Sequence, residues 1–325
     1  MKEGELKVPE KGITRRRFLE TTGQAVVFAH QKLTLSNIGK AVLAADQGPR
    51  LLEVFDPESK VQFVPGQENR FPSESGVLAL GGMTVENAGE IAKAITPGLG
   101  LLGPVMYADY ADIGLDVPSI AKDILKVQKE KGVNTLSLYC HSMGSIVAAE
   151  LVGCISDKIK IDTIFFDCSP VNYGDTRSGG VGDAFADISS IYRGSIITGI
   201  FNANVYGNPL VGGSPDLLGS QLVALDNGNK RISSLATIVE RDNSDVIFLR
   251  PRDASKDDVV LDEKAEQSLL KHFPRMRVSL LEGKQGHANP IVNKDEYNRK
   301  IREAIFDGTI IASERYIDRQ KIKSS

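Results

Sequence analysis

The sequence is poor in cysteine and histidine, and this limits the kinds of site that it can build. Its 325 residues include only three cysteines, Cys140, Cys154 and Cys168, and four histidines. An odd number of cysteines does not make a disulfide framework, and the CxxC spacing of a zinc site is missing. H-E-x-x-H zinc motifs and G-x-x-x-x-G-K-[ST] phosphate loops are also missing. We therefore expect neither a metal ion nor a cofactor.

Long apolar runs and an excess of positive charge are missing as well. No stretch of 18 or more residues is convincingly apolar, so we expect no membrane-spanning helix. The net charge of −3 argues against nucleic-acid binding, which needs a basic surface. Hydrophobic residues make up 41% and charged residues 25% of the chain, which excludes a mainly disordered, collagen-like or coiled-coil protein.

The first 45 residues differ from the rest and resemble an export leader. Residues 14–19 read T-R-R-R-F-L, which is similar to the twin-arginine signal S/T-R-R-x-F-L. A mildly apolar stretch follows, and the small-residue run that ends at Ala45 resembles a cleavage site before Asp46. The resemblance implies export to the periplasm or the medium; without a working leader the protein would stay in the cytoplasm. Cleavage would leave 31 basic and 38 acidic residues, a net charge of −7.

From about residue 50, short β-branched or apolar runs alternate with amphipathic helical stretches. This order predicts an α/β fold with a mostly parallel sheet covered by helices on both faces. Residues 98–103 match G-x-G-x-x-G, but a helix is expected before them and a strand after them. A dinucleotide site needs the reverse order, so we interpret this segment as a loop.

The most informative segment is residues 140–144, which read C-H-S-M-G between an expected strand and an expected helix. This resembles the nucleophile elbow G-x-S-x-G of the α/β-hydrolase superfamily, with Ser142 as the nucleophile. The residues two before and two after the serine must be small, because their side chains would collide across the turn. Gly144 meets this need, and Cys140 replaces the first glycine. Cys140 is an alternative nucleophile, although it would lie on the strand side of the turn.

The resemblance implies that a histidine after the last strand serves as the general base. His287 lies there, in the loop of residues 282–287. His30 lies in the leader, and His141 should point away from the hydroxyl of the adjacent Ser142. His272 is expected on a helix among apolar residues and is interpreted as structural. We therefore expect His287 to transfer the proton.

The resemblance also implies an acid after the strand expected at residues 246–249. The run D-D-V-V that begins at Asp257 is similar to the D-x-V-V ending of the family, which favours Asp257. Asp253 is closer to the strand and is the main rival, and Asp258 is the third candidate. The chain order serine, acid, histidine matches the order in the superfamily.

Two backbone N–H groups should form the oxyanion hole. One is expected from Met143, directly after the nucleophile. The second is expected from the loop of residues 80–84, which is similar to the H-G-x segment of the family. Aligning Gly81 and Gly82 with that segment makes Met83 the donor, and a shift of one residue would make it Gly82.

An insertion of about 75 residues is expected between two late strands and is too long for a simple connection. The predicted organisation is a leader at residues 1–45 and an α/β-hydrolase domain at residues 46–325. Its cap would cover residues 171–244, and residues 194–215 of that insertion contain no charge. The resemblance implies a serine esterase or lipase with a small, apolar ester or acyl substrate. Amide, thioester or acyl-transfer chemistry and a non-catalytic binding protein are the alternatives.

Overall fold

A computed structural model describes six stretches of the chain, and together they contain the whole sheet discussed below. These stretches are residues 59–82, 88–110, 115–176, 224–257, 259–283 and 290–308. The predicted leader at residues 1–45 lies outside them. Among the described residues, no helix has both the length and the hydropathy that are needed to cross a bilayer.

The centre of the fold is a seven-stranded sheet with the order β1-β3-β2-β4-β5-β6-β7. Strand β1 runs antiparallel to β3, and every other neighbouring pair is parallel. The parallel strands therefore end at one common edge of the sheet. The strands are β1 (Lys60–Phe63), β2 (Ser75–Leu80), β3 (Val105–Asp109), β4 (Thr135–His141), β5 (Lys160–Asp167), β6 (Asp245–Pro251) and β7 (Arg277–Leu281).

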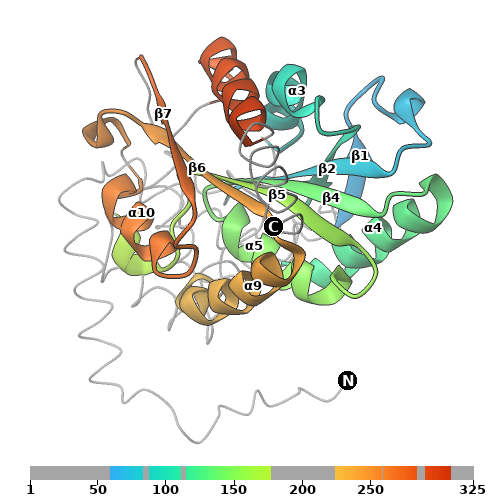
Figure 1. The fold of residues 1–325 in the computed structure, drawn as a ribbon, viewed down its shortest axis with the longest axis horizontal. Helices are drawn as coiled ribbons and strands as arrows, with labels where there is room; N and C mark the ends of the chain where they lie inside the picture. The colour runs from blue at the N-terminus through green and yellow to red at the C-terminus, as the bar shows by residue number, and fades with distance from the viewer. Residues whose placement is uncertain are drawn as a thin grey trace, which may run out of the picture.

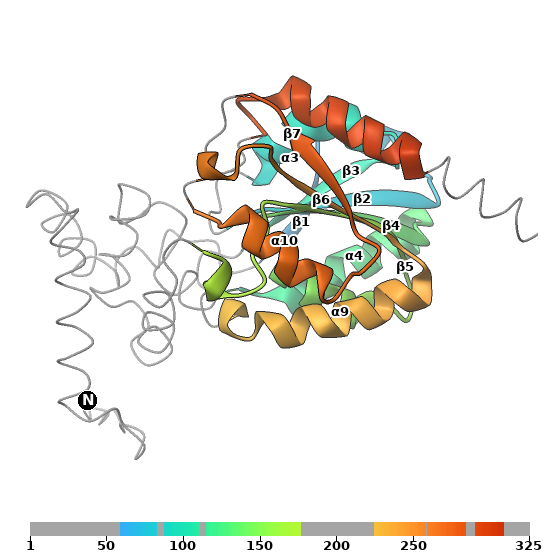
Figure 2. The ribbon, with the colours of Figure 1, turned by 60° about the vertical axis from the view of Figure 1, so that its left-hand side comes forward.

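Helices cover both faces of this sheet (Figures 1 and 2). Helix α3 (Ala88–Leu99) and the helix of residues 294–308 lie on one face. Helices α4 (Val117–Lys131), α5 (Gly144–Ile155), α9 (Gly228–Asp242) and α10 (Asp262–Leu270) pack on the other face. The predicted α/β class, with a mostly parallel sheet between two helical layers, is confirmed.

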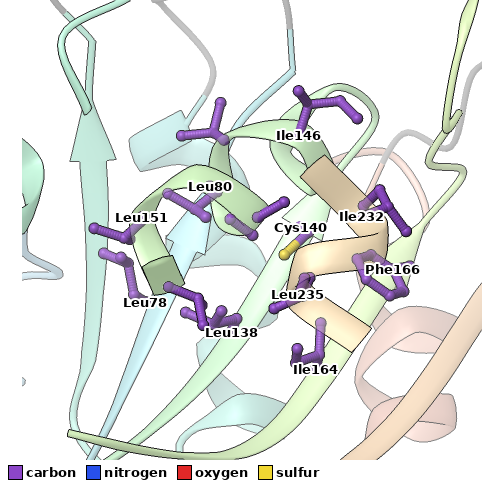
Figure 3. Close-up of a cluster of buried hydrophobic side chains, with 14 of the residues drawn as sticks. Leu78, Leu80, Leu138, Cys140, Ile146, Leu151, Ile164, Phe166, Ile232 and Leu235 are labelled. Atoms are coloured by element: carbon purple, nitrogen blue, oxygen red, sulfur yellow. The ribbon is translucent and has the colours of Figure 1, made fainter. Parts of the chain in front are cut away.

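The two helical layers bury separate apolar clusters. Figure 3 shows the larger cluster, where side chains of β2, β4 and β5 meet α5 and α9. Helix α5 lies at its centre and is apolar on almost every side, as expected for a helix that is covered by α4 and α9. The smaller cluster joins α3 and the helix of residues 294–308 to the opposite face. Such burial contributes about 25 cal/mol per Å² of apolar surface.

Local sequence signals set the ends of α4, the helix that precedes β4 along the chain. The carboxylate of Asp116 accepts the backbone N–H of Ser119 at 3.2 Å and caps the helix. Pro118 stands in the first turn, where its missing N–H costs no hydrogen bond. Gly132 ends the helix at φ 78°, a left-handed conformation that favours glycine. Residue 135 then begins β4, so these caps fix where the strand starts.

The predicted insertion is described only at its two ends. Helix α9 falls inside the predicted range of 171–244, and it packs beside α5 through Ile232 and Leu235 (Figure 3). Residues 177–223 lie outside the described stretches, so a cap formed by them stays a prediction. The G-x-G-x-x-G segment begins in α3 and ends just before β3, as its interpretation as a non-nucleotide loop requires.

Candidate active site

Ser142 occupies a tight turn between the carboxyl end of β4 and the start of α5. Its φ of 51° places it in the left-handed region, which is unfavourable for a residue other than glycine. Such a conformation costs on the order of 1 kcal/mol and persists only where the surroundings hold it. Ser142 retains only 7% exposure. The strand–turn–helix context predicted for this serine is confirmed.

Hydrogen bonds with the end of β5 and with the residues that follow it hold this turn. The N–H of Ser142 donates to the carbonyl of Asp167 at 2.8 Å. The hydroxyl of Ser145 donates to the carbonyls of Ser142 and Pro170, at 3.2 and 3.1 Å. The hydroxyl of Ser169 donates to the carbonyl of residue 140 at 2.9 Å. The strained turn is therefore attached to the neighbouring strand on both sides of Ser142.

The small residues that flank Ser142 are required by close packing. A Cβ at Gly144 would lie 2.5 Å from the carbonyl oxygen of Leu80 and 3.0 Å from that of Gly81. The end of β2 can approach α5 only because Gly144 has no side chain. Cys140 is fully buried in the cluster of Figure 3, and burial raises the pKa of its thiol well above the usual range. A buried protonated thiol is a poor nucleophile, which argues against Cys140 as the alternative.

Gly82 brings the end of β2 against Ser142. A Cβ at Gly82 would lie 3.0 Å from the Cβ of Ser142 and 3.4 Å from its Oγ. The loop after β2 therefore begins beside the hydroxyl, where the second oxyanion donor was expected. Met143, the first expected donor, is buried at the N-cap of α5. The second candidate, Met83, lies outside the described residues.

The loop after β6 distinguishes the acid candidates by burial. Asp257 is fully buried, and its Oδ1 accepts the N–H groups of Val259 and Val260, both at 2.8 Å. Asp253 is exposed, and its Oδ1 accepts the N–H and the hydroxyl of Ser255 at 3.1 and 2.7 Å. Asp253 thus caps a local 3₁₀ turn, whereas Asp257 lies inside the protein. Asp258 lies outside the described residues.

The predicted base, His287, lies outside the described residues, between the end of β7 and the helix of residues 294–308. His30 also lies outside them. His272 follows α10 at the amino end of β7, so it lies at the edge of the sheet opposite to Ser142. Burial and the charge of Lys271 lower the pKa of His272. Of the described histidines, only His141 is near Ser142.

A buried polar network on the α3 side of the turn was missed by the sequence analysis. Asp167, the last residue of β5, is fully buried and pairs in register with His141 of β4. Its Oδ2 contacts the Nδ1 of His141 at 2.8 Å and accepts the hydroxyl of Tyr139 at 2.5 Å. Its Oδ1 accepts the hydroxyl of Tyr297 at 3.2 Å. The sequence did carry one signal for this network. Tyr139 and His141 are polar residues at alternate positions of a mostly buried strand, so their side chains share one face of the sheet.

Asp257 lies next to the end of β5. Ligand atoms of Cys168, Asp257 and Asp262 lie within 4.8 Å of one another, a group that could hold a cation. Burial, and then the nearby carboxylates, raise the pKa of the Cys168 thiol well above its usual value. Metal binding would require loss of this thiol proton. Cys168 directly follows β5, the strand next to β4, so Asp257 lies near the end of β5.

The three cysteines differ in exposure. From the sequence, all three lie on or beside expected core elements and are predicted to be buried; this holds for Cys140 and Cys168, whereas Cys154 is exposed and its prediction is wrong. Cys154 lies in the last turn of α5 and is exposed to solvent. All three are free thiols.

A cavity of about 340 Å³ lies away from the serine turn. It is lined by the end of α9, by the first residues of β6 and by the segment of residues 271–276. The amino ends of the parallel strands lie there, whereas Ser142 follows the carboxyl end of β4. In open α/β sheets, ligands bind at the carboxyl ends of the strands, so the serine turn remains the candidate active site.

No protein-family model and no curated protein sequence matches the chain. Solved structures with a similar overall shape include a carboxylesterase of Nitrososphaera gargenis, with 11% identity and a TM-score of 0.49 over 79% of this chain and 95% of that one. A lipase-esterase related protein of Clostridium acetobutylicum has 13% identity and a TM-score of 0.49 over 75% and 98%. A 2-hydroxy-6-oxo-6-phenylhexa-2,4-dienoate hydrolase of Rhodococcus has 17% identity and a TM-score of 0.48 over 72% and 91%.

Likeness of this degree does not transfer a reaction from one protein to another. The fold follows instead from the chain's own topology. An antiparallel first strand precedes a parallel sheet in which β2 lies between β3 and β4. A serine at positive φ connects β4, the central strand of the sheet, to a buried helix. The described part of the chain therefore has the α/β-hydrolase fold, with Ser142 at its strand-to-helix turn.

Proposed function

We propose that this protein is a serine hydrolase that cleaves carboxylic esters through an acyl-enzyme. The observation that carries the proposal is the strained turn at Ser142, which presents a serine beside the glycine loop after β2. A residue is held in such a conformation only where the surroundings over-determine it, and such strain clusters at active sites. Ser142 follows the carboxyl end of a central strand, as the nucleophile does in the α/β-hydrolase fold.

In the proposed reaction, the Oγ of Ser142 attacks the ester carbonyl while His287 takes the hydroxyl proton. The tetrahedral intermediate collapses as its bond to the alcohol oxygen breaks, and His287 returns the proton to the departing alcohol. Water then attacks the acyl-enzyme by the same route and releases the carboxylic acid. Asp257 orients His287 and stabilises its charged form.

The backbone N–H groups of Met143 and Met83 are proposed to hold the oxyanion, with Gly82 as the alternative to Met83. Helix α5 begins directly after Met143, so its N-terminal dipole favours negative charge at this point. Asp257 is proposed over Asp253 because Asp257 is buried next to the end of β5, whereas Asp253 is exposed and caps a local turn. No cofactor takes part in this scheme.

An ester series tests the proposed substrate class. We expect hydrolysis of p-nitrophenyl esters from acetyl to dodecanoyl, with the Ser142→Ala variant as the blank. If the uncharged residues 194–215 help to bind the acyl chain, kcat/KM should rise about fourfold per added methylene at first. Absorbance of released p-nitrophenol measures the rates. Hydrolysis of the matching anilides, but not of the esters, would point to an amidase and contradict the ester class.

We also propose that the protein is exported through the leader at residues 1–45. Expressed in a host with a twin-arginine pathway, the exported protein should begin at Asp46 when its N-terminus is sequenced. Replacing both Arg15 and Arg16 with Lys should leave the full-length chain in the cytoplasm, because the signal is read through its arginine pair. Exported protein that still begins at Met1, or that is unaffected by the double substitution, would contradict this.

A further inference from the structure

Asp167 contacts three side chains that come from two different elements of the fold. Two of them, Tyr139 and His141, belong to β4, and the third, Tyr297, belongs to the helix of residues 294–308. Figure 2 shows this helix lying across the face of the sheet that carries α3. The carboxylate therefore joins the strand that leads to Ser142 with a helix from the far end of the chain.

The chemistry of the donors identifies the carboxylate as an acceptor. Burial, and then the charge of Asp167, raise the pKa of Tyr139 and Tyr297 well above 10, so both hydroxyls keep their protons and donate. Oδ2 of Asp167 already accepts the hydroxyl of Tyr139, so we assign Nδ1 of His141, 2.8 Å away, as a second donor to this oxygen. A fully buried carboxylate is tolerated when its oxygens are satisfied in this way.

This network acts directly on the serine turn. His141 immediately precedes Ser142, and the ring carbon Cδ2 of His141 would lie 3.6 Å from a Cβ on Gly82. Asp167 also accepts the backbone N–H of Ser142 through its own carbonyl, at 2.8 Å. The residue thus holds the turn through both its main chain and its side chain. Tyr297 belongs to the helix that follows the segment carrying His287.

We propose that Asp167 is a positioning residue that fixes the serine turn through His141 and ties it to the helix of residues 294–308 through Tyr297. This inference rests on the proposed function of Ser142. Phe165 lies two residues earlier on the same face of β5, and its apolar side chain packs in the smaller cluster. An apolar residue would therefore also fit this face at position 167, so we attribute the carboxylate there to its hydrogen bonds and not to packing.

Two substitutions at His141 separate positioning from packing. In His141→Asn, the amide nitrogen lies near the position of Nδ1 and can still donate to Asp167, but the ring is lost. In His141→Phe, the ring volume is kept, but the donor is lost. Asp167→Asn removes the charge at nearly constant volume. The second-order rate of Ser142 modification by a fluorophosphonate is measured for each variant and the parent, well below the melting temperature of each.

We expect the rate to fall about 10-fold to 100-fold in His141→Phe and Asp167→Asn, because small displacements of a nucleophile cost this much. His141→Asn should stay within about threefold of the parent. The opposite order, with Phe active and Asn impaired, would show a packing role and overturn the proposal, as would parental rates in both His141→Phe and Asp167→Asn. No adduct on the parent would overturn the function of Ser142 itself, and this inference with it.

Discussion

Replacing Asp257 with Asn is expected to lower kcat for ester hydrolysis by about 10⁴-fold, because the amide would no longer orient and stabilise the charged form of His287. The fold should be retained, since the amide oxygen of Asn can still accept the N–H groups of Val259 and Val260. Steady-state kinetics on the best p-nitrophenyl ester measure the loss, and circular dichroism confirms the fold.

The matched control is Asp253→Asn, in the same loop. Asp253 is exposed and accepts the N–H and the hydroxyl of Ser255, so its substitution should change kcat less than twofold and stability by at most about 0.5 kcal/mol. An inactive Asp253→Asn variant beside an active Asp257→Asn variant would assign the acid to Asp253. Parental activity in both would leave Asp258 as the remaining candidate and would contradict the role given to Asp257.

The second large effect is expected from Gly144→Ala. The new Cβ would lie 2.5 Å from the carbonyl oxygen of Leu80, and that oxygen belongs to the backbone of a central strand. Either α5 or the end of β2 must shift, which should lower the free energy of unfolding by about 3 kcal/mol. The same shift would displace Ser142, so ester hydrolysis should fall about 100-fold. Urea denaturation and steady-state kinetics measure the two effects.

Gly153→Ala, on the same helix, provides the comparison. A Cβ at Gly153 would meet no atom within 4 Å, so only helix propensity changes. We expect the free energy of unfolding to rise by about 0.5–1 kcal/mol with unchanged kinetics. Equal effects of the two substitutions would mean that the close approach of Leu80 to α5 does not hold the turn in place.

The fold class could be predicted because it depends on local signals. Short apolar or β-branched runs indicated strands, and apolar residues spaced three or four apart indicated helices. The alternation of these strands and helices along the chain indicated a mostly parallel sheet. The serine turn was equally local, since five consecutive residues and their flanking elements define it. The antiparallel pairing of β1 with β3 could not be predicted in the same way, because it joins Lys60 to Asp109 across a long stretch of chain.

The polar network at Asp167 could not be predicted from the sequence, because it also joins residues that are far apart along the chain. Tyr297 lies 130 residues from Asp167 along the chain, and nothing in the local pattern around either residue indicates their contact. Residues on neighbouring strands become partners only through the register of the sheet, which pairs His141 with Asp167. The difference in burial between Asp257 and Asp253 could not be predicted either, because the two residues lie only four positions apart in one polar loop.

The central claim is that Ser142 is an activated nucleophile. The most direct test is reaction of the folded protein with a fluorophosphonate, followed by intact-mass measurement and peptide mapping. The account predicts a single adduct on Ser142 that is lost in Ser142→Ala and strongly slowed in His287→Ala, because a serine without its base is a weak nucleophile. A folded protein that takes up no label, or that carries the adduct on a different residue, would contradict it.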